Sequence, residues 1–74
     1  MRLPQISGKD LVKVFNKFGF KIIRQRGSHV QIEKIDDNEI IKITIPMHPK
    51  LKKGTLSHII KVSKIDEREL EKCL

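Results

Sequence analysis

The sequence predicts an α+β fold in which one helix, three antiparallel strands, a second helix and a short terminal helix follow one another. Apolar residues recur at helical spacing early in the chain, alternate with polar residues in the middle, and return to helical spacing after Pro46. The links between the strands are short, which favours an antiparallel meander. With 74 residues, we expect residues 1–74 to form one domain, a thin two-layer fold of one sheet and its helices.

The first helix is the most clearly delimited element. Ser7 can cap its start, and Asp10, three residues on, completes a short version of a capping box. Gly19 ends it, because glycine readily takes the left-handed conformation that closes a helix. The predicted buried face consists of Leu11, Val14, Phe15 and Phe18.

Three segments have the pattern of strands: residues 20–26, 29–34 and 40–45. Gly27-Ser28 and Asp36-Asp37-Asn38 are the predicted links between them. The inner face of the first strand stays ambiguous, because Ile22 and Ile23 are adjacent. Pro46 ends the third strand, since proline has no N–H to donate to a ladder.

The last third of the chain predicts a basic loop and two helices. The loop covers residues 47–53, and the second helix is expected to begin near Thr55 with the stripe Leu56, Ile59 and Ile60. Asp66 caps the short final helix. Cys73 falls at the apolar spacing of that helix, and we expect it to pack rather than react.

The charge is strongly positive and unevenly spread. Sixteen Lys and Arg residues against nine Asp and Glu residues give a net charge of +7. Two basic blocks are interrupted by the acidic turn at residues 36–39, which suggests a basic face whose natural partner is a polyanion such as nucleic acid. A solvated, lysine-rich surface that favours solubility is the alternative with equal weight.

The single cysteine excludes an internal disulfide framework and fits a reducing compartment. No apolar run approaches the length of a membrane span, and residues 1–10 lack the apolar core of a signal peptide. We therefore expect a cytoplasmic protein with no membrane partner.

The alternation of the second strand predicts the orientation of His29. If Val30 and Ile32 face the helices, His29 lies on the opposite, open face of the sheet. The neighbours expected on that face are Lys42 and Thr44 from the third strand, with Arg24 or Arg26 from the first.

A histidine among cations suits RNA cleavage without a metal, because histidine exchanges a proton near neutral pH. It can take the proton from a ribose 2′-hydroxyl, whose oxygen then attacks the adjacent phosphorus, while Lys or Arg stabilises the charge on the phosphate. An exposed histidine with no chemical role is the alternative.

A second group of candidates lies between residues 46 and 55. Free N–H groups at a helix start near Thr55 favour phosphate binding, and helix capping by Thr55 is compatible with it. Three lysines before and at the expected helix start would add to the attraction of these N–H groups for a phosphate: Lys50, Lys52 and Lys53. His48, between two prolines, is a second proton-transfer candidate or a supporting residue that anchors the loop, and we favour the supporting role.

Other chemistries find little support. The three histidines lack a cysteine or carboxylate cluster at ligand spacing, so neither a metal nor another cofactor is expected. Ser28 adjoins His29 along a strand, and side chains of neighbouring strand residues point to opposite faces, which argues against a nucleophilic triad. The three phenylalanines are all assigned to the core, which leaves no aromatic side chain for stacking on bases.

The motifs taken together resemble the HicA toxin family. The resemblance rests on Gly27-Ser28-His29 after a basic strand, followed by Pro46-x-His48 and by Lys53-Gly54-Thr55-Leu56. It covers nearly the whole chain, and the combination in this order and spacing is specific, whereas Gly-Ser-His alone is weak.

The resemblance implies a fold like the double-stranded-RNA-binding domain and the activity of an mRNA interferase, a ribonuclease that blocks translation by cutting messages. It implies that His29 is the catalytic residue. It also implies a HicB antitoxin that covers the active site. A non-catalytic RNA-binding module remains the alternative, and a third interpretation treats the basic face mainly as a docking site for an acidic antitoxin.

Overall fold

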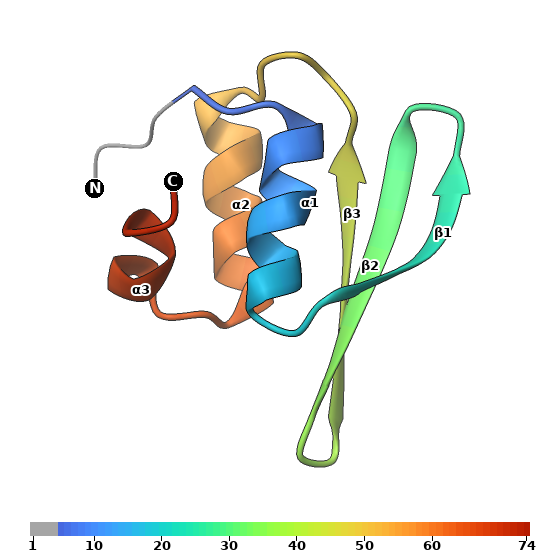
Figure 1. Ribbon diagram of the computed structural model, residues 1–74, viewed down its shortest axis with the longest axis vertical. Helices are drawn as coiled ribbons and strands as arrows, with labels where there is room; N and C mark the ends of the chain where they lie inside the picture. Colours follow the sequence, from blue (N-terminus) through green and yellow to red (C-terminus); the bar gives the residue numbers. More distant parts are fainter. Residues whose placement is uncertain (1–4) are drawn as a thin grey trace.

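A computed structural model describes residues 5–74 and contains the predicted order of elements (Figure 1). The elements are α1 (Gly8–Lys17), β1 (Lys21–Arg26), β2 (His29–Asp36), β3 (Glu39–Pro46), α2 (Lys53–Ser63) and α3 (Glu67–Glu71). The strands form one antiparallel sheet in the order β1-β2-β3. The α+β fold of the double-stranded-RNA-binding-domain type is therefore confirmed.

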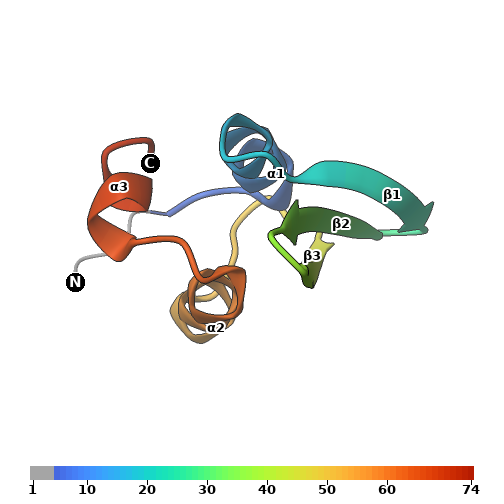
Figure 2. The same cartoon turned by 90° about the horizontal axis from the view of Figure 1, so that it is seen from below.

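The helices α1 and α2 pack against one face of the sheet, close to β3, and leave the other face open (Figure 2). The short helix α3 lies on the far side of the helix pair from the sheet, where Leu70 is fully buried. Alternate residues of β2 and β3 face the helices and form the centre of the core, namely Val30, Ile32, Ile41, Ile43 and Ile45. The remaining residues of these strands define the open face.

Both ends of α1 form as the sequence predicts. The Ser7 side-chain oxygen accepts a hydrogen bond of 3.1 Å from the Asp10 N–H. At the other end Gly19 has φ of +96°, and the N–H of Phe20 reaches back to the carbonyl of Phe15 at 3.1 Å, the pattern of a Schellman motif. The rings of Phe15 and Phe20 meet edge to face with 5.3 Å between centroids, which closes the motif with an apolar contact.

The start of α1 also lies very close to the end of β3. A Cβ atom added to Gly8 would lie 2.0 Å from the carbonyl oxygen of Pro46. The N–H of Gly8 donates to the carbonyl of His48 at 3.0 Å. A residue with a side chain cannot replace Gly8 here without moving the backbone.

The sheet settles the ambiguity in the first strand. The register between β1 and β2 shifts between Ile22 and Arg24, so that Ile23 is an extra residue without a cross-strand partner. Ile22 pairs with Ile32 on the helix side, yet both Ile22 and Ile23 remain exposed. The second and third strands are longer than predicted, because β2 runs to Asp36 and β3 spans Glu39–Pro46, so the turn is confined to Asp37-Asn38. The first strand is one residue shorter than predicted and begins at Lys21.

The expected start of α2 near Thr55 is wrong. The helix begins at Lys53 with Lys52 as its N-cap, and no side chain caps it. The cause lies just before the helix, where Leu51 is buried and its N–H donates to the carbonyl of Ile6 at 2.9 Å. This anchor sets the point at which the chain turns into the helix, and Thr55 falls within the first turn.

The expectation that Cys73 packs into the core is also wrong, because the thiol is exposed. The terminal helix spans only Glu67–Glu71, so its apolar spacing does not continue regularly to residue 73. Leu70 fills the available core position instead. Among residues 5–74, no helix has the combination of length and apolar character that crossing a membrane requires.

Candidate active site

His29 is the first residue of β2 and follows the tight turn at Gly27-Ser28. Gly27 takes φ of +55°, a conformation that side chains disfavour, and this turn returns the chain from β1 into β2. His29 pairs with Arg26 on one side and Pro46 on the other. Its side chain is exposed on the open face, the orientation that the alternation predicts.

A shallow hollow of about 200 Å³ surrounds His29 on this face. The residues that line it come from all three strands: Arg24, Arg26, His29, Gln31 and Thr44. The cross-strand register explains the grouping, because Arg24 lies opposite Gln31 and Gln31 lies opposite Thr44. We call this region the cationic end of the open face. His29 is the one histidine among these lining residues, and the two arginines supply fixed positive charge.

Of the predicted phosphate-binding residues, Arg24 and Arg26 line the hollow, and Lys42 does not. Lys42 pairs with Glu33, two cross-strand pairs from Thr44, and is the next β3 residue on the open face beyond the hollow. Its side chain is exposed and lies on the same open face as His29.

The lysines of the loop and of the start of α2 do not line the hollow. Lys50, Lys52 and Lys53 are exposed, and Gly54 has open space where a side chain would be. The N–H of Met47 donates to the carbonyl of Ser28 at 2.6 Å, which joins this loop to the turn before His29. The start of α2, the end of β3 and the β1–β2 turn therefore lie at the same end of the molecule (Figure 1).

His48 is exposed on the same loop but does not line the hollow. Its backbone carbonyl, and not its imidazole, holds the start of α1 through the bond from Gly8. The residue thus contributes to an anchor through the main chain. Thr55 is half-buried in the first turn of α2.

Sequence reasoning missed a second region of the open face, at the hairpin between β2 and β3. Ile35 and Ile40 pair directly across the strands and are 69% and 57% exposed. Ile23 shares a hollow of about 340 Å³ with Ile35 and Glu33. We call Ile23, Ile35 and Ile40 the isoleucine end. The signal was available, because period-two alternation places Ile35 on the face of His29 and Ile40 on the face of Lys42.

Within residues 5–74, no group of three or more His, Cys, Asp or Glu side chains is arranged to hold a metal ion. The described part of the chain contains two ion pairs, and neither touches the hollow. Lys64 at the end of α2 pairs with Glu39 at the start of β3, and Lys72 lies 3.7 Å from Glu69.

The fold and its open face place this chain among the small basic α+β proteins of the double-stranded-RNA-binding-domain type. A protein-family comparison then identifies the family: the model described as "HicA toxin of bacterial toxin-antitoxin" matches residues 8–65. The chain belongs to the HicA toxin family, and it is the toxin of a toxin–antitoxin pair whose partner is an antitoxin. No curated protein and no solved structure matches the chain.

Proposed function

We propose that the protein is an mRNA interferase, an endoribonuclease that cuts messages in the cytoplasm without a metal and thereby blocks translation. The observation that carries this proposal is the exposed imidazole of His29 in a hollow shared with Arg24 and Arg26. A group that moves protons near neutral pH and two fixed cations are what cleavage by a ribose 2′-hydroxyl needs.

In the proposed reaction, His29 takes the proton from the 2′-hydroxyl of the nucleotide before the cut. The 2′-oxygen attacks the neighbouring phosphorus, the bond from phosphorus to the 5′-oxygen breaks, and the 5′-oxygen takes up a proton. The products are a 2′,3′-cyclic phosphate and a 5′-hydroxyl end. The guanidinium groups of Arg24 and Arg26 stabilise the negative charge that builds on the phosphate oxygens.

Lysines outside the hollow bind the phosphates on either side of the cut. Lys50, Lys52 and Lys53 belong to the loop and the start of α2, at the end of the molecule that carries the β1–β2 turn (Figure 1), and Lys42 lies beside the hollow on the open face. Contacts of this kind are independent of sequence and weaken as salt rises. His48 and the Gly27-Ser28 and Gly54 motif positions support this surface by shaping the turn and the loop.

The antitoxin partner in this proposal is a HicB-type protein that covers the open face. The isoleucine end gives such a partner an apolar contact, because isoleucines grouped and exposed on one face are typical of a surface that another protein covers. A protein bound there extends over the neighbouring cationic end and shields His29 from RNA.

The direct test is incubation of purified protein with a message in the presence of EDTA, followed by sizing of the RNA. The wild type is expected to produce fragments with cyclic phosphate ends. His29→Ala is expected to remain folded and to bind RNA without cutting it. His58→Ala is the matched control, because His58 is an exposed histidine on α2.

Two results contradict the proposal in different ways. Intact RNA with the wild type, together with salt-sensitive binding, identifies a non-catalytic RNA-binding module instead. Full cleavage by His29→Ala at equal protein concentration removes His29 from the mechanism and leaves the nuclease activity to other residues.

A further inference from the structure

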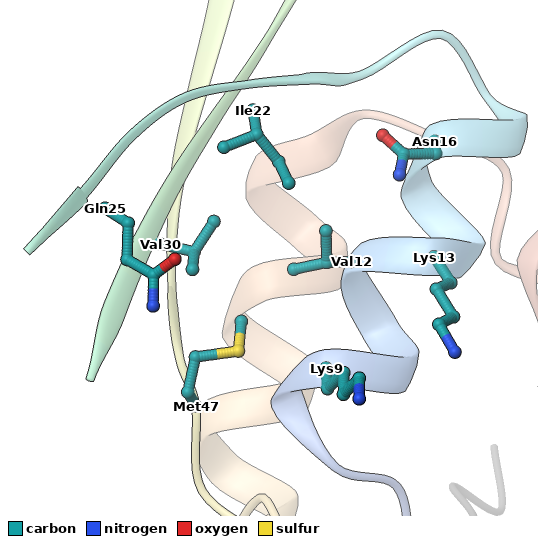
Figure 3. Close-up of a pocket in the computed structure, with 8 residues that line it drawn as sticks. All are labelled: Lys9, Val12, Lys13, Asn16, Ile22, Gln25, Val30 and Met47. Carbon is teal, nitrogen blue, oxygen red and sulfur yellow. The ribbon is translucent and has the colours of Figure 1, made fainter. Parts of the chain in front are cut away.

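A groove separates α1 from β1 on the helix side of the sheet (Figure 3). Its volume is about 360 Å³, near the lower end of the range for small-ligand sites. Apolar side chains from four segments form its interior: Val12, Ile22, Val30 and Met47. Ile22 is 55% exposed although it faces the helices, so the groove is a place where β1 is not covered by α1.

The rim of the groove carries hydrogen-bonding and charged groups. Asn16 on α1 and Gln25 on β1 lie on opposite sides of it, and Lys9 and Lys13 extend along the α1 side (Figure 3). Amide side chains bind the edges of nucleobases, and ammonium groups bind phosphates. A methionine thioether, such as that of Met47, can form favourable contacts with an aromatic ring.

The groove adjoins the proposed cleavage site through the β1–β2 turn. Met47, in its interior, donates its N–H to the carbonyl of Ser28 at 2.6 Å, and the Gln25 amide donates to the carbonyl of Gly27 at 3.3 Å. Gln25 alternates along β1 with Arg24 and Arg26, which line the hollow on the other face. The hollow and the groove thus lie on opposite faces of β1, which is an edge strand. An RNA chain that crosses this edge of the sheet can contact both.

From this juxtaposition we propose that the groove between α1 and β1 binds one unstacked nucleobase of the substrate RNA, next to the cleaved bond. Asn16 and Gln25 bind the base edge and select among bases, the apolar interior contacts its ring, and Lys9 and Lys13 hold the adjoining phosphate. This inference rests on the proposed function, because it takes RNA as the ligand. It gives the enzyme a base preference at one flanking position.

The test uses a randomised pool of short 2′-O-methyl RNA, which binds but lacks the hydroxyl needed for cleavage. Bound RNA is sequenced for the wild type, Asn16→Ala and Gln25→Ala. The wild type is expected to enrich particular bases at one position by about fivefold or more, and both variants are expected to lose most of this enrichment. Asn38→Ala, in the distant β2–β3 turn, is the amide control and is expected to match the wild type.

A lysine pair separates phosphate binding from base selection. Lys13→Ala is expected to weaken binding of the whole pool several-fold without changing the base preference. Lys17→Ala removes the same charge from the same helix outside the groove and is expected to bind more tightly than Lys13→Ala. Circular dichroism of each variant verifies that these exposed substitutions leave the fold intact.

Two outcomes overturn the inference. One is a wild type that enriches no base; the other is an enrichment that Asn16→Ala and Gln25→Ala leave unchanged. If these variants keep the enrichment and bind the antitoxin more weakly than the wild type, the groove is assigned to a protein segment instead. Because the pool cannot be cleaved, these results are obtained even if unmodified RNA stays intact, which is the separate failure of the proposed nuclease activity.

Discussion

The two ends of the open sheet face are built by the same three strands but have opposite chemistry. The cationic end holds His29 between arginines of β1 and Thr44 of β3. The isoleucine end, some cross-strand pairs away, exposes Ile35 and Ile40 opposite each other. Nucleic acid binds through charge, and protein partners bind through apolar contacts that exclude water. In the proposed function, the two ends of this face bind two different partners, one through charge and the other through apolar contacts.

The largest expected effect lies at the cationic end. His29→Ala is expected to reduce the cleavage rate by about 10²–10⁴-fold, the usual contribution of a general acid or base. Ile40→Ser, at the other end of the same face, is expected to cleave like the wild type. Initial rates on one fluorescent RNA measure both. Equal reductions of the cleavage rate in the two variants would contradict a catalytic role confined to the cationic end.

The next effect concerns salt. Removing both arginines with Arg24→Ala and Arg26→Ala is expected to reduce the magnitude of the slope of log binding constant against log salt by about 1.4. This value assumes that each arginine makes one phosphate contact and that each contact on a single strand contributes roughly 0.7 to the slope. Lys21→Ala with Lys61→Ala removes the same charge outside the hollow and serves as the control. A titration of RNA binding between low and moderate salt gives the slopes. Identical slopes in the two double variants contradict a localised phosphate site.

A third effect concerns the isoleucine end and the antitoxin. Ile35→Ser with Ile40→Ser is expected to weaken antitoxin binding by about tenfold or more, because a fully buried isoleucine contributes roughly 1.5–3 kcal/mol. Cleavage is expected to be unchanged, which yields a toxin that its antitoxin inhibits poorly. Val62→Ser, an exposed apolar residue on α2, is the control. Calorimetric titration of the antitoxin into each variant measures the affinity, and unchanged affinity removes the isoleucines from the interface.

The smallest expected effect is on stability near the isoleucine end. Lys64 pairs with Glu39, which lies next to Ile40 and joins the start of β3 to the end of α2. Both side chains are more than half exposed, so Glu39→Gln is expected to lower the free energy of unfolding by less than about 1 kcal/mol. Urea denaturation measures the change. A larger loss would indicate that this ion pair holds the hairpin in place.

Local pattern predicted much of the fold and the orientation of the central residue. The cap at Ser7, the stop at Gly19 and the outward direction of His29 each depend on residues a few positions apart. Such features are set by helical or strand periodicity, which a sequence displays directly. The family resemblance added the toxin class, and the match over residues 8–65 bears out that part.

What the sequence did not predict depends on contacts between distant segments. The start of α2 is set by the bond from Leu51 to Ile6, and nothing near Thr55 reveals that anchor. Cys73 is exposed because Leu70 already occupies the core position. The groove beside Ile22 exists because α1 leaves part of β1 uncovered, a matter of how the helix lies on the sheet. The catalytic role of His29 and the phosphate contacts stay predictions until the assays are done.

The bulge in β1 leaves Ile23 without a cross-strand partner, so the pairing of β1 with β2 does not depend on this residue. Lys21 and Ile22 keep their sides through pairing with Glu33 and Ile32, while Arg24 and Arg26 keep theirs through Gln31 and His29. Shortening the strand by that one residue therefore restores plain alternation and turns none of its neighbours over. A toxin lacking Ile23 would keep Arg24 and Arg26 beside His29, and it would offer the proposed antitoxin interface one isoleucine fewer.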